Sequence, residues 1–373
     1  MAKKLKKTKK PMSPKTKNIA INSFKGIISN QACIENGKEA PWWLAILFLL
    51  VSILIPLIPN FVSLNNAYGA SFVSNATYGL DTGLARASIQ LKKDGKTLNV
   101  ENGLLSYSDT ASEDPIYSYT DANTNRYTFL MYFSDYQGSE LQNFVNKIVN
   151  QKFILNKDAD GKTVAGSTTI YNPELDPDKK EATYTPSFVI LSPSTLVAAT
   201  YKADTTTRVA NTFGGLDWNN TPNGDLLERI TSAIKDENGN VIDINTIDLE
   251  HLPTQVTSQA FGVWKNIFNE TFLNQKNTNK WNTTLIYLGV YTGLTFFLGL
   301  MLFLLTRSKT NPFRTLNFWV TQKIAYFLAL TPAILALILG FVMAGNIIGQ
   351  MAFVLLLSLR VMWASMKQLR PVA

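Results

Sequence analysis

The chain has 373 residues, with 35 Lys and Arg against 27 Asp and Glu, one His and one Cys, and its formal net charge is +8. A single Cys excludes a disulfide within the chain, and one His with one Cys excludes metal sites built from His and Cys ligands. The basic residues lie beside long apolar runs, so anionic lipid is a simpler partner for them than nucleic acid.

The charges fall into three blocks along the chain. Residues 1–40 hold ten Lys and two Glu, residues 63–280 have a net charge of −7, and residues 281–373 carry +7 without any Asp or Glu. In membrane proteins, positively charged flanking segments stay in the cytoplasm. The pattern therefore predicts a multi-pass plasma-membrane protein with two cytoplasmic termini, in which residues 63–280 are extracytoplasmic.

Residues 1–40 are predicted to form a basic cytoplasmic tail with a short amphipathic helix. The first 17 residues are too charged to bury an apolar surface. Three roles remain open for them: a solvated determinant of topology, an anchor on anionic lipid, and a contact with nucleic acid or the ribosome. Five apolar residues then recur at helical spacing, which fits an interfacial helix or a packed cytoplasmic helix. They are Ile19, Ile21, Phe24, Ile27 and Ile28.

Residues 41–62 are predicted to form the first transmembrane helix. Trp42 and Trp43 fit the aromatic belt at a membrane surface, and Pro56 and Pro59 should kink or end the helix. The charged region ahead is too long for an ordinary signal peptide, so a signal anchor is favoured over cleavage. The residues expected to anchor the chain on lipid are Lys3, Lys4, Lys6, Lys7, Lys9, Lys10, Trp42 and Trp43.

Residues 63–280 are predicted to fold as a large extracytoplasmic α+β domain inserted between the first and second spans. Strands are expected at Arg86–Leu91, Thr97–Val100, Arg126–Phe133, Phe188–Leu191 and Leu196–Tyr201. Asp94-Gly95 should join the first two strands as a hairpin, and Ser192-Pro193-Ser194 should join the last two. Loops are expected at Asp109–Asn125, Asn156–Thr185 and Gly214–Gly224.

Helical periodicity marks three further segments of this domain. They are Leu141–Val149, Asp225–Ile234 and a longer helix over Gln255–Asn274 that should continue into the second span. The longer helix carries an aromatic stripe of Phe261, Trp264, Phe268 and Phe272, which core packing explains better than a ligand site does.

The last quarter of the chain is predicted to be a membrane-embedded helical block. It contains spans at 281–305, 323–344 and 346–363, a cytoplasmic loop at 306–322 and a cytoplasmic tail at 364–373. Apolar runs of this kind cross ~30 Å of hydrocarbon at ~1.5 Å per residue. Arg360 interrupts the final run and is expected to snorkel to the headgroups from the last turn. The fold class is therefore four transmembrane helices, one and then three.

The loop at 306–322 is the candidate contact with a cytoplasmic partner. Arg307, Lys309 and Arg314 could meet an acidic surface, while Phe313 and Phe318 become buried in it. The alternative is that the same residues hold the loop against the inner leaflet.

No enzymatic chemistry is indicated. His251 has no Ser or Cys motif beside it, so it is interpreted as an ordinary surface or core residue. Asn156–Gly161 resembles the first half of a calcium loop, but position 12 is Ser167 instead of Glu, which favours a polar turn. The spans contain no carboxylate, which argues against ion-coupled transport. We expect no catalytic residue, metal or cofactor.

Several segments resemble a family of membrane proteins from low-GC Gram-positive bacteria, the maltodextrose-utilisation membrane proteins. The matching stretches are Ser13-Pro14-Lys15, Glu101–Leu104, Ser187–Leu191 and Ile324–Leu337, of which Thr331-Pro332 matches best. The resemblance implies a link to sugar transport. The arrangement of one span, an outer domain and three spans is also similar to permeases of mechanotransmitting ABC systems, which have a short amphipathic helix before the first span.

These features together predict a non-enzymatic bacterial membrane protein. The expected role is an accessory or regulatory component of a transport system, with carbohydrate uptake as the candidate. The alternative is a permease-like membrane subunit of a mechanotransmitting ABC-type complex, and a lower alternative is a membrane-anchored extracellular enzyme or adhesin. The expected partners are the lipid bilayer and other membrane proteins, ABC transporter subunits among them, and nucleic acid is not expected.

Overall fold

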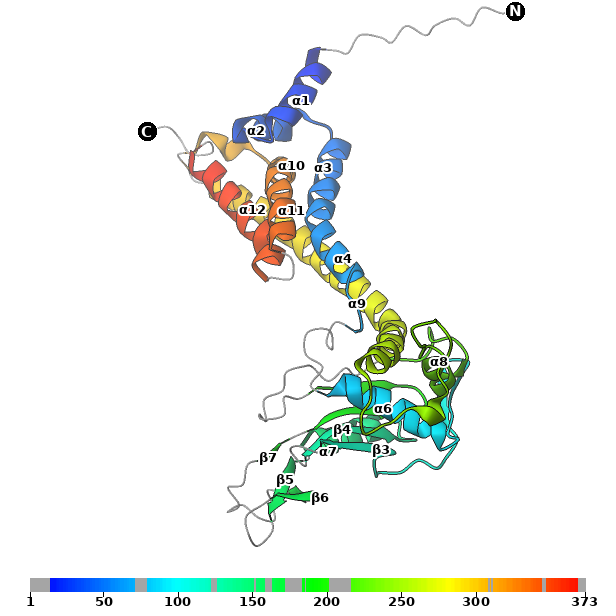
Figure 1. The fold of residues 1–373 in the computed structure, drawn as a ribbon. Helices are drawn as coiled ribbons and strands as arrows, with labels where there is room; N and C mark the ends of the chain where they lie inside the picture. The colour runs from blue at the N-terminus through cyan, green and yellow to red at the C-terminus, as the bar shows by residue number, and fades with distance from the viewer. Residues whose placement is uncertain are drawn as a thin grey trace, which may run out of the picture. The chain divides into compact units, whose positions relative to one another are not determined.

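The chain divides into two compact units in a computed structural model (Figure 1). The helical unit comprises residues Met1–Asn66 and Thr278–Ala373, and the sheet domain comprises Ala67–Asn277. The structure describes residues 14–70, 79–121, 126–150, 152–157, 163–171, 183–184, 186–200, 216–307, 309, 311–343 and 347–367. The sheet domain falls within the predicted domain at 63–280.

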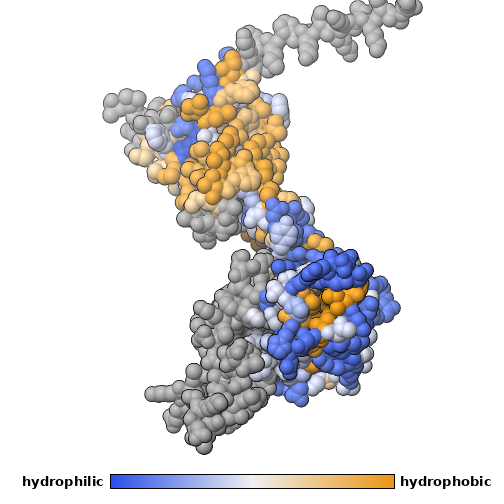
Figure 2. Space-filling model, viewed as in Figure 1, coloured by the Kyte–Doolittle hydropathy of each residue, from blue (hydrophilic) through white to orange (hydrophobic). Residues whose placement is uncertain are grey.

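The helical unit is built from helices. Its elements are α1 (Pro14–Lys25), α2 (Asn30–Glu39), α3 (Trp42–Leu54), the 3-10 turn η1 (Ile55–Leu57), α4 (Ile58–Asn65), the later part of α9 (Thr254–Leu305), η3 (Pro312–Thr315), α10 (Phe318–Leu328), α11 (Leu330–Val342) and α12 (Ile347–Lys367). Apolar side chains cover much of its visible surface, whereas polar side chains dominate the described surface of the sheet domain (Figure 2).

Three stretches are long and apolar enough to cross a membrane: Trp42–Asn65, Thr254–Leu305 and Phe318–Val342. They overlap the first three predicted spans, at 41–62, 281–305 and 323–344. The fourth predicted span, at 346–363, overlaps α12, where Met351–Met366 forms a shorter apolar helix. The apolar helices indicate a membrane location.

Prolines interrupt two of these stretches, the first of them at Pro56 as the sequence predicts. Pro56 lies in the 3-10 turn η1 between α3 and α4. Pro332 lies in the first turn of α11, which is separated from α10 by Ala329. Proline has no backbone N–H and clashes with the carbonyl four residues earlier, so both stretches depart from a continuous α-helix.

The N-terminal segment contains two helices instead of the one that was predicted. α1 ends at Lys25, so Ile27 and Ile28 lie in the turn that follows it. Ser29 caps α2 by accepting a hydrogen bond from the Ala32 N–H at 3.4 Å. The helix α2 escapes prediction because it has few apolar residues, and tertiary contacts stabilise short helices more than propensity does.

Gly37 allows α2 to approach α10 closely. A Cβ atom at Gly37 would lie 2.3 Å from the Cγ1 of Ile324, well inside van der Waals contact. The buried residues at this junction include Cys33 and Ile34 of α2 and Ile324 and Phe327 of α10. The polar-looking helix is thus part of the unit's core.

The sheet domain is organised around a four-stranded mixed sheet in the order β3-β4-β8-β9. Its strands are β3 (Tyr117–Asp121), β4 (Arg126–Phe133), β8 (Ser187–Leu191) and β9 (Leu196–Ala199). β4 and β8 are parallel, and the two outer pairs are antiparallel. The last three strands confirm predictions, including the turn at 192–194.

Both faces of this sheet are buried. Phe129, Met131 and Phe133 of β4 join a core with α6 (Leu80–Lys93), α8 (Leu226–Thr231) and the first part of α9. Leu130 and Tyr132 join a second core with α7 (Gly138–Asn150). This alternation follows from the two-residue period of a strand. Helices therefore cover both faces, and α7 confirms a predicted helix.

The predicted hairpin at Arg86–Leu91 and Thr97–Val100 is wrong. Arg86–Leu91 belongs to helix α6, whose buried face repeats over more turns than this short alternating window reveals. The hairpin forms instead between β1 (Leu98–Glu101) and β2 (Leu104–Tyr107). Asn102 and Gly103 have φ of 52° and 77°, as a type I′ turn requires. Asp94-Gly95 ends α6.

Two of the predicted loops contain strands. β3 lies within Asp109–Asn125, and Asn156–Thr185 includes β6 (Thr163–Tyr171), β7 (Thr183–Tyr184) and the end of β5 (Lys152–Lys157). Thr and Tyr favour strands despite their polar groups, so a polar composition misled the prediction. The small sheets have the orders β6-β5-β7 and β10-β1-β2, where β10 is Gly224–Asp225.

Helix α9 confirms the predicted continuation from the domain into the second span. It runs without a break over Thr254–Leu305, although the division between the units falls within it. Phe261, Trp264 and Phe268 are buried in the core of the sheet domain, with Phe272 partly buried beside them. The aromatic stripe is therefore a packing feature.

Candidate functional site: an arginine cluster in the helical unit

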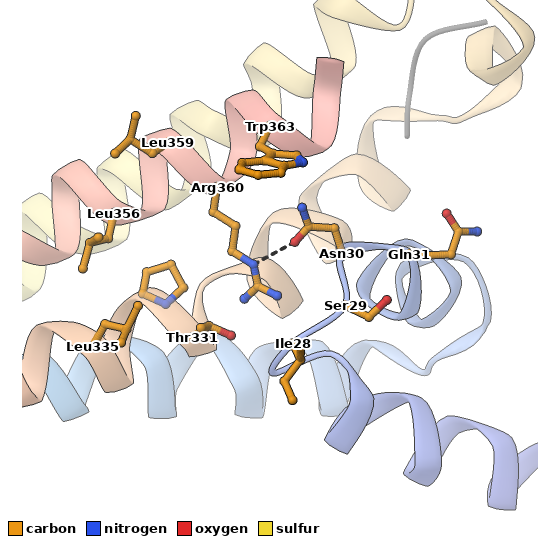
Figure 3. Close-up of a pocket in the computed structure, with 11 residues that line it drawn as sticks. Ile28, Ser29, Asn30, Gln31, Thr331, Leu335, Leu356, Leu359, Arg360 and Trp363 are labelled. Atoms are coloured by element: carbon orange, nitrogen blue, oxygen red, sulfur yellow. Dashed lines mark hydrogen bonds between the residues drawn. The ribbon is translucent and has the colours of Figure 1, made fainter. Parts of the chain in front are cut away.

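Arg360 of α12 lies at the centre of a polar cluster in the helical unit (Figure 3). The helix α12 extends to Lys367, so Arg360 is not in its last turn. The prediction that Arg360 lies in the last turn of its helix is therefore wrong. Its guanidinium lies between the α1–α2 turn and the start of α11.

Three oxygen atoms accept hydrogen bonds from the guanidinium. Nε donates to Oδ1 of Asn30 at 2.9 Å, Nη1 to the carbonyl of Leu328 at 2.9 Å, and Nη2 to the carbonyl of Gly26 at 2.5 Å. Nη2 also lies 3.8 Å from Cys33 Sγ. Among the described residues, Arg360 forms no salt bridge with a carboxylate. Two backbone carbonyls and the side-chain oxygen of Asn30 therefore hold this cation in place.

Those carbonyls are available because of the local sequence. Pro332 has no N–H to donate to the carbonyl of Leu328, four residues earlier, so that oxygen needs another donor. The carbonyl of Gly26 follows the last turn of α1. Helix C-termini carry a partial negative charge, so the ends of α10 and α1 both favour a cation.

Two further side chains secure the α1–α2 turn. Cys33 Sγ lies 3.3 Å from the carbonyl oxygen of Gly26 and 3.5 Å from that of Phe327, and the Thr331 hydroxyl donates to the carbonyl of Ile27. Burial raises the pKa of the Cys33 thiol to about 11, and the positive charge of Arg360 opposes this only in part.

We expect native Cys33 to react very slowly with thiol reagents. At pH 7, a thiol with a pKa near 11 is about one part in 10,000 thiolate, the reactive form. Alkylation of the folded chain in detergent should accelerate between pH 8 and 10 and should be far faster in denaturant, where the pKa returns toward 9.0. Mass spectrometry would measure it. Rapid alkylation of the folded chain at pH 7 would contradict the buried geometry.

A cavity of about 700 Å³ opens beside Arg360. Ser29, Asn30 and Gln31 lie on one side of the guanidinium, and Leu335, Leu356 and Leu359 lie on the other (Figure 3). Thr331, Pro332, Ile28 and Trp363 complete the wall. The cavity is therefore polar at one end and apolar at the other.

The five residues predicted to contact a partner do not form one exposed surface. Arg307 donates to the carbonyl of Leu316 and stacks 4.1 Å from the ring centroid of Phe303. Phe313 packs against the unit's core, and Phe318 lies 5.9 Å from Phe296. Lys309 and Arg314 are exposed.

The predicted lipid anchor is described only in part. Lys3, Lys4, Lys6, Lys7, Lys9 and Lys10 lie outside the described residues. Trp43 is 67% exposed, and Trp42 packs edge-to-face against Trp319 at 5.7 Å. The buried Lys323 donates to the carbonyl of Ala40 at 2.7 Å, which fixes the start of α3.

The sheet domain offers little catalytic geometry among its described residues. His251 is exposed in a turn, and its Nδ1 lies 3.0 Å from Oδ2 of Asp248. No described cluster of three His, Cys, Asp or Glu side chains could hold a metal ion. The loop interpreted as a polar turn instead of a calcium site includes residues 158–162, outside the described residues.

Sequence reasoning missed the partners of Arg360. Pro332 signals that the carbonyl of Leu328 is unpaired, but nothing local reveals that an arginine from α12 binds it.

Comparison of the chain with family models, curated proteins and solved structures finds no match. The resemblance to the maltodextrose-utilisation membrane proteins therefore stays a prediction.

Proposed function

We propose that this chain is a non-enzymatic plasma-membrane protein that serves a transport system as an accessory or regulatory component. In this proposal the sheet domain is extracytoplasmic, α12 is the fourth span, and α9 carries the state of the domain to membrane partners. The resemblance found in the sequence makes carbohydrate uptake the first system to test.

The observation that carries the proposal is the continuity of α9. One helix supplies Trp264 and Phe268 to the core of the sheet domain and Tyr291 and Leu302 to the core of the helical unit. A continuous helix that contributes to two packed cores is a physical route by which a change in one can bias the other.

Membrane placement is supported by the side chains that the helical unit exposes. Leu285, Ile286, Ile338 and Leu359 are more than half exposed, which suits hydrocarbon and not water. Aromatic residues lie toward both ends of the first span, with Trp42 at its start and Phe61 packed against Trp281 near its end. Such pairs of aromatic bands are typical of membrane interfaces.

We expect single-cysteine variants to reveal the topology. In a Cys33→Ser background, Cys at the exposed positions Glu237 and Asn219 should react with an impermeant maleimide in intact cells, whereas Cys at Lys309 or Arg314 should react only after permeabilisation. Gel-shift labelling measures both. Labelling of the loop positions in intact cells, with protection of the domain positions, would invert the topology.

The functional test is purification of the tagged full chain in mild detergent with quantitative mass spectrometry. Enrichment of transporter subunits over an unrelated membrane protein supports the accessory role, and its absence in several detergents overturns it.

Transmission through α9 has its own test. Two alanines inserted after Asn277 rotate the later helix by about 200°, whereas seven nearly restore the phase. Only the first insertion should abolish regulation of maltodextrin uptake.

A mechanotransmitting ABC-type subunit is the second candidate. It is favoured by α1, a helix that precedes the first span and exposes Phe24. Any contact with an ATPase at the cytoplasmic loop would depend mainly on the exposed Lys309 and Arg314, because Phe313 and Phe318 are partly buried against other residues of the unit. Charge reversal at Lys309 or Arg314 should release a co-purifying ATPase, and reversal at the exposed Lys235 should not. Equal recovery from all variants would exclude this loop as the contact.

A further inference from the structure

We propose that the cavity beside Arg360 is a binding site for an anionic phospholipid, whose phosphate group meets Arg360 and whose acyl chain lies along Leu335, Leu356 and Leu359 (Figure 3). This goes beyond surface attraction between basic residues and lipid, because it assigns a defined pocket to one molecule. It rests on the membrane location within the proposed function but not on the transport role.

The first argument is the unused hydrogen-bonding capacity of Arg360. A guanidinium has five N–H groups. Three donate to oxygen atoms, and one Nη2 hydrogen is near Cys33 Sγ, so a donor on Nη1 remains among the described contacts. Arg360 lines the cavity. Because two backbone carbonyls and Asn30 hold the guanidinium, it is preorganised for a phosphate oxygen, which arginine binds well.

The second argument is the shape and polarity of the cavity. About 700 Å³ is within the usual range for small-molecule pockets. Polar side chains and the cation lie at one end, and three leucines lie at the other, which matches the division of a lipid between headgroup and chain. Leu335 and Leu359 are 44% and 57% exposed, so the apolar end is open toward the surface of the unit.

The third argument is charge. Residues 1–66 and 278–373 contain 18 Lys and Arg against two Glu, a net charge of +16. One of the two carboxylates, Glu35, accepts hydrogen bonds from Asn22 and Gln31 and does not line the cavity. The field of the unit therefore favours an anionic ligand over a zwitterionic one.

The fourth argument places the cavity at headgroup depth. Ile28 and Trp363, which line it, are 92% and 57% exposed, and Phe24 on the preceding helix is 77% exposed. Large apolar and aromatic side chains next to Ser29, Asn30 and Gln31 are typical of the membrane interface, where one end of a site is wet and the other is apolar.

The test measures lipid binding to the purified full chain in detergent by native mass spectrometry. Short-chain phosphatidylglycerol should bind at least about tenfold more tightly than phosphatidylcholine with the same chains, equivalent to about 1.4 kcal/mol. Inorganic phosphate should compete only weakly, because it cannot use the leucines. Equal binding of the two lipids overturns the proposal. Phosphate binding as tightly as phosphatidylglycerol also overturns it, since the ligand would then be a soluble anion.

Variants distinguish lipid binding in this pocket from non-specific binding that depends on the overall charge and hydrophobicity of the unit. Gln31→Glu places a negative charge at the polar end, and Leu359→Trp fills the apolar end. Each should weaken phosphatidylglycerol binding about tenfold or more. The matched controls are Asn279→Asp and Leu304→Trp, at exposed positions of α9 within the same unit, and should bind as wild type. Arg360→Gln should abolish binding.

Because Arg360 also holds the α1–α2 turn, loss of folding in Arg360→Gln would carry no weight by itself, and the two pocket variants decide. Wild-type binding by both Gln31→Glu and Leu359→Trp overturns the proposal. Failure of the transport role appears in the co-purification experiment and leaves this measurement unaffected. A chain that remains soluble without detergent would overturn the membrane location and the lipid site together.

Discussion

The Trp264→Ala variant is expected to unfold its sheet domain roughly 6 to 20 °C below the wild type. Trp264 is fully buried in the core that it shares with residues of α6 and the mixed sheet, and truncation of a buried Trp costs about 3–5 kcal/mol. In a domain of this size, each kcal/mol shifts the midpoint by about 2–4 °C. Thermal unfolding of the full chain in detergent, followed by circular dichroism, measures the shift.

The hydrogen bond of Trp264 contributes less to the stability of the domain than the burial of its side chain does. Its Nε1 donates to Ser88 Oγ at 2.9 Å, but the Ser88 hydroxyl also donates to the carbonyl of Leu84 at 2.7 Å and keeps that bond in the variant. Trp264→Phe should therefore lose clearly less stability than Trp264→Ala. Val241→Ala is the control, because Val241 is 57% exposed. A loss no larger for Trp264→Ala than for Val241→Ala would contradict the assigned core.

Substitution of Gly37 by Leu is expected to detach α2 from α10 and to expose Cys33. A Cβ at this position lies 2.3 Å from the Ile324 side chain and 3.1 Å from its backbone, and the backbone cannot rotate away. Release of the helix would return the Cys33 thiol from a pKa of about 11 toward 9.0. At pH 8, the two-unit change raises the thiolate fraction on the order of 100-fold.

The measurement is the alkylation rate of Cys33 in the purified full chain at pH 8. Gly289→Leu is the matched control, because a Cβ at Gly289 on α9 meets nothing within 4 Å. It should alkylate as slowly as the wild type. If Gly37→Leu also alkylates at the wild-type rate and unfolds at the wild-type temperature, close packing of α2 on α10 does not determine the environment of Cys33.

The sequence alone located the long apolar helices and much of the domain's secondary structure. Stretches such as Phe318–Val342 are so apolar that helix is the main hydrogen-bonded state open to them in hydrocarbon. The helix at Leu141–Val149 and the stripe at Phe261, Trp264 and Phe268 were equally visible, because a 3.6-residue period sustained over several turns has no strand counterpart.

The secondary structure of short or polar segments depends on the elements that they pack against. Arg86–Leu91 alternates like a strand but packs as part of the longer α6, and the threonine-rich β6 looks like loop until β5 pairs with it. Helix α2 has little apolar character, and its place follows from the close approach of Gly37 to Ile324. In each case the local preference is worth less than the tertiary contacts that override it.

The candidate site depended most on the tertiary structure. The sequence shows that Arg360 is a charge in an apolar run and that Pro332 leaves a carbonyl unpaired. Both features can be recognised from neighbouring residues alone. That the guanidinium reaches Leu328, Gly26 and Asn30 is not local, because Gly26 and Asn30 lie on the α1–α2 turn and Leu328 lies at the end of α10, both far from Arg360 in the chain. A hydrogen bond requires distances near 3 Å between specific atoms. Sequence determined that Arg360 needed polar partners, and only the packing of α12 against the α1–α2 turn and the α10–α11 break decided which ones.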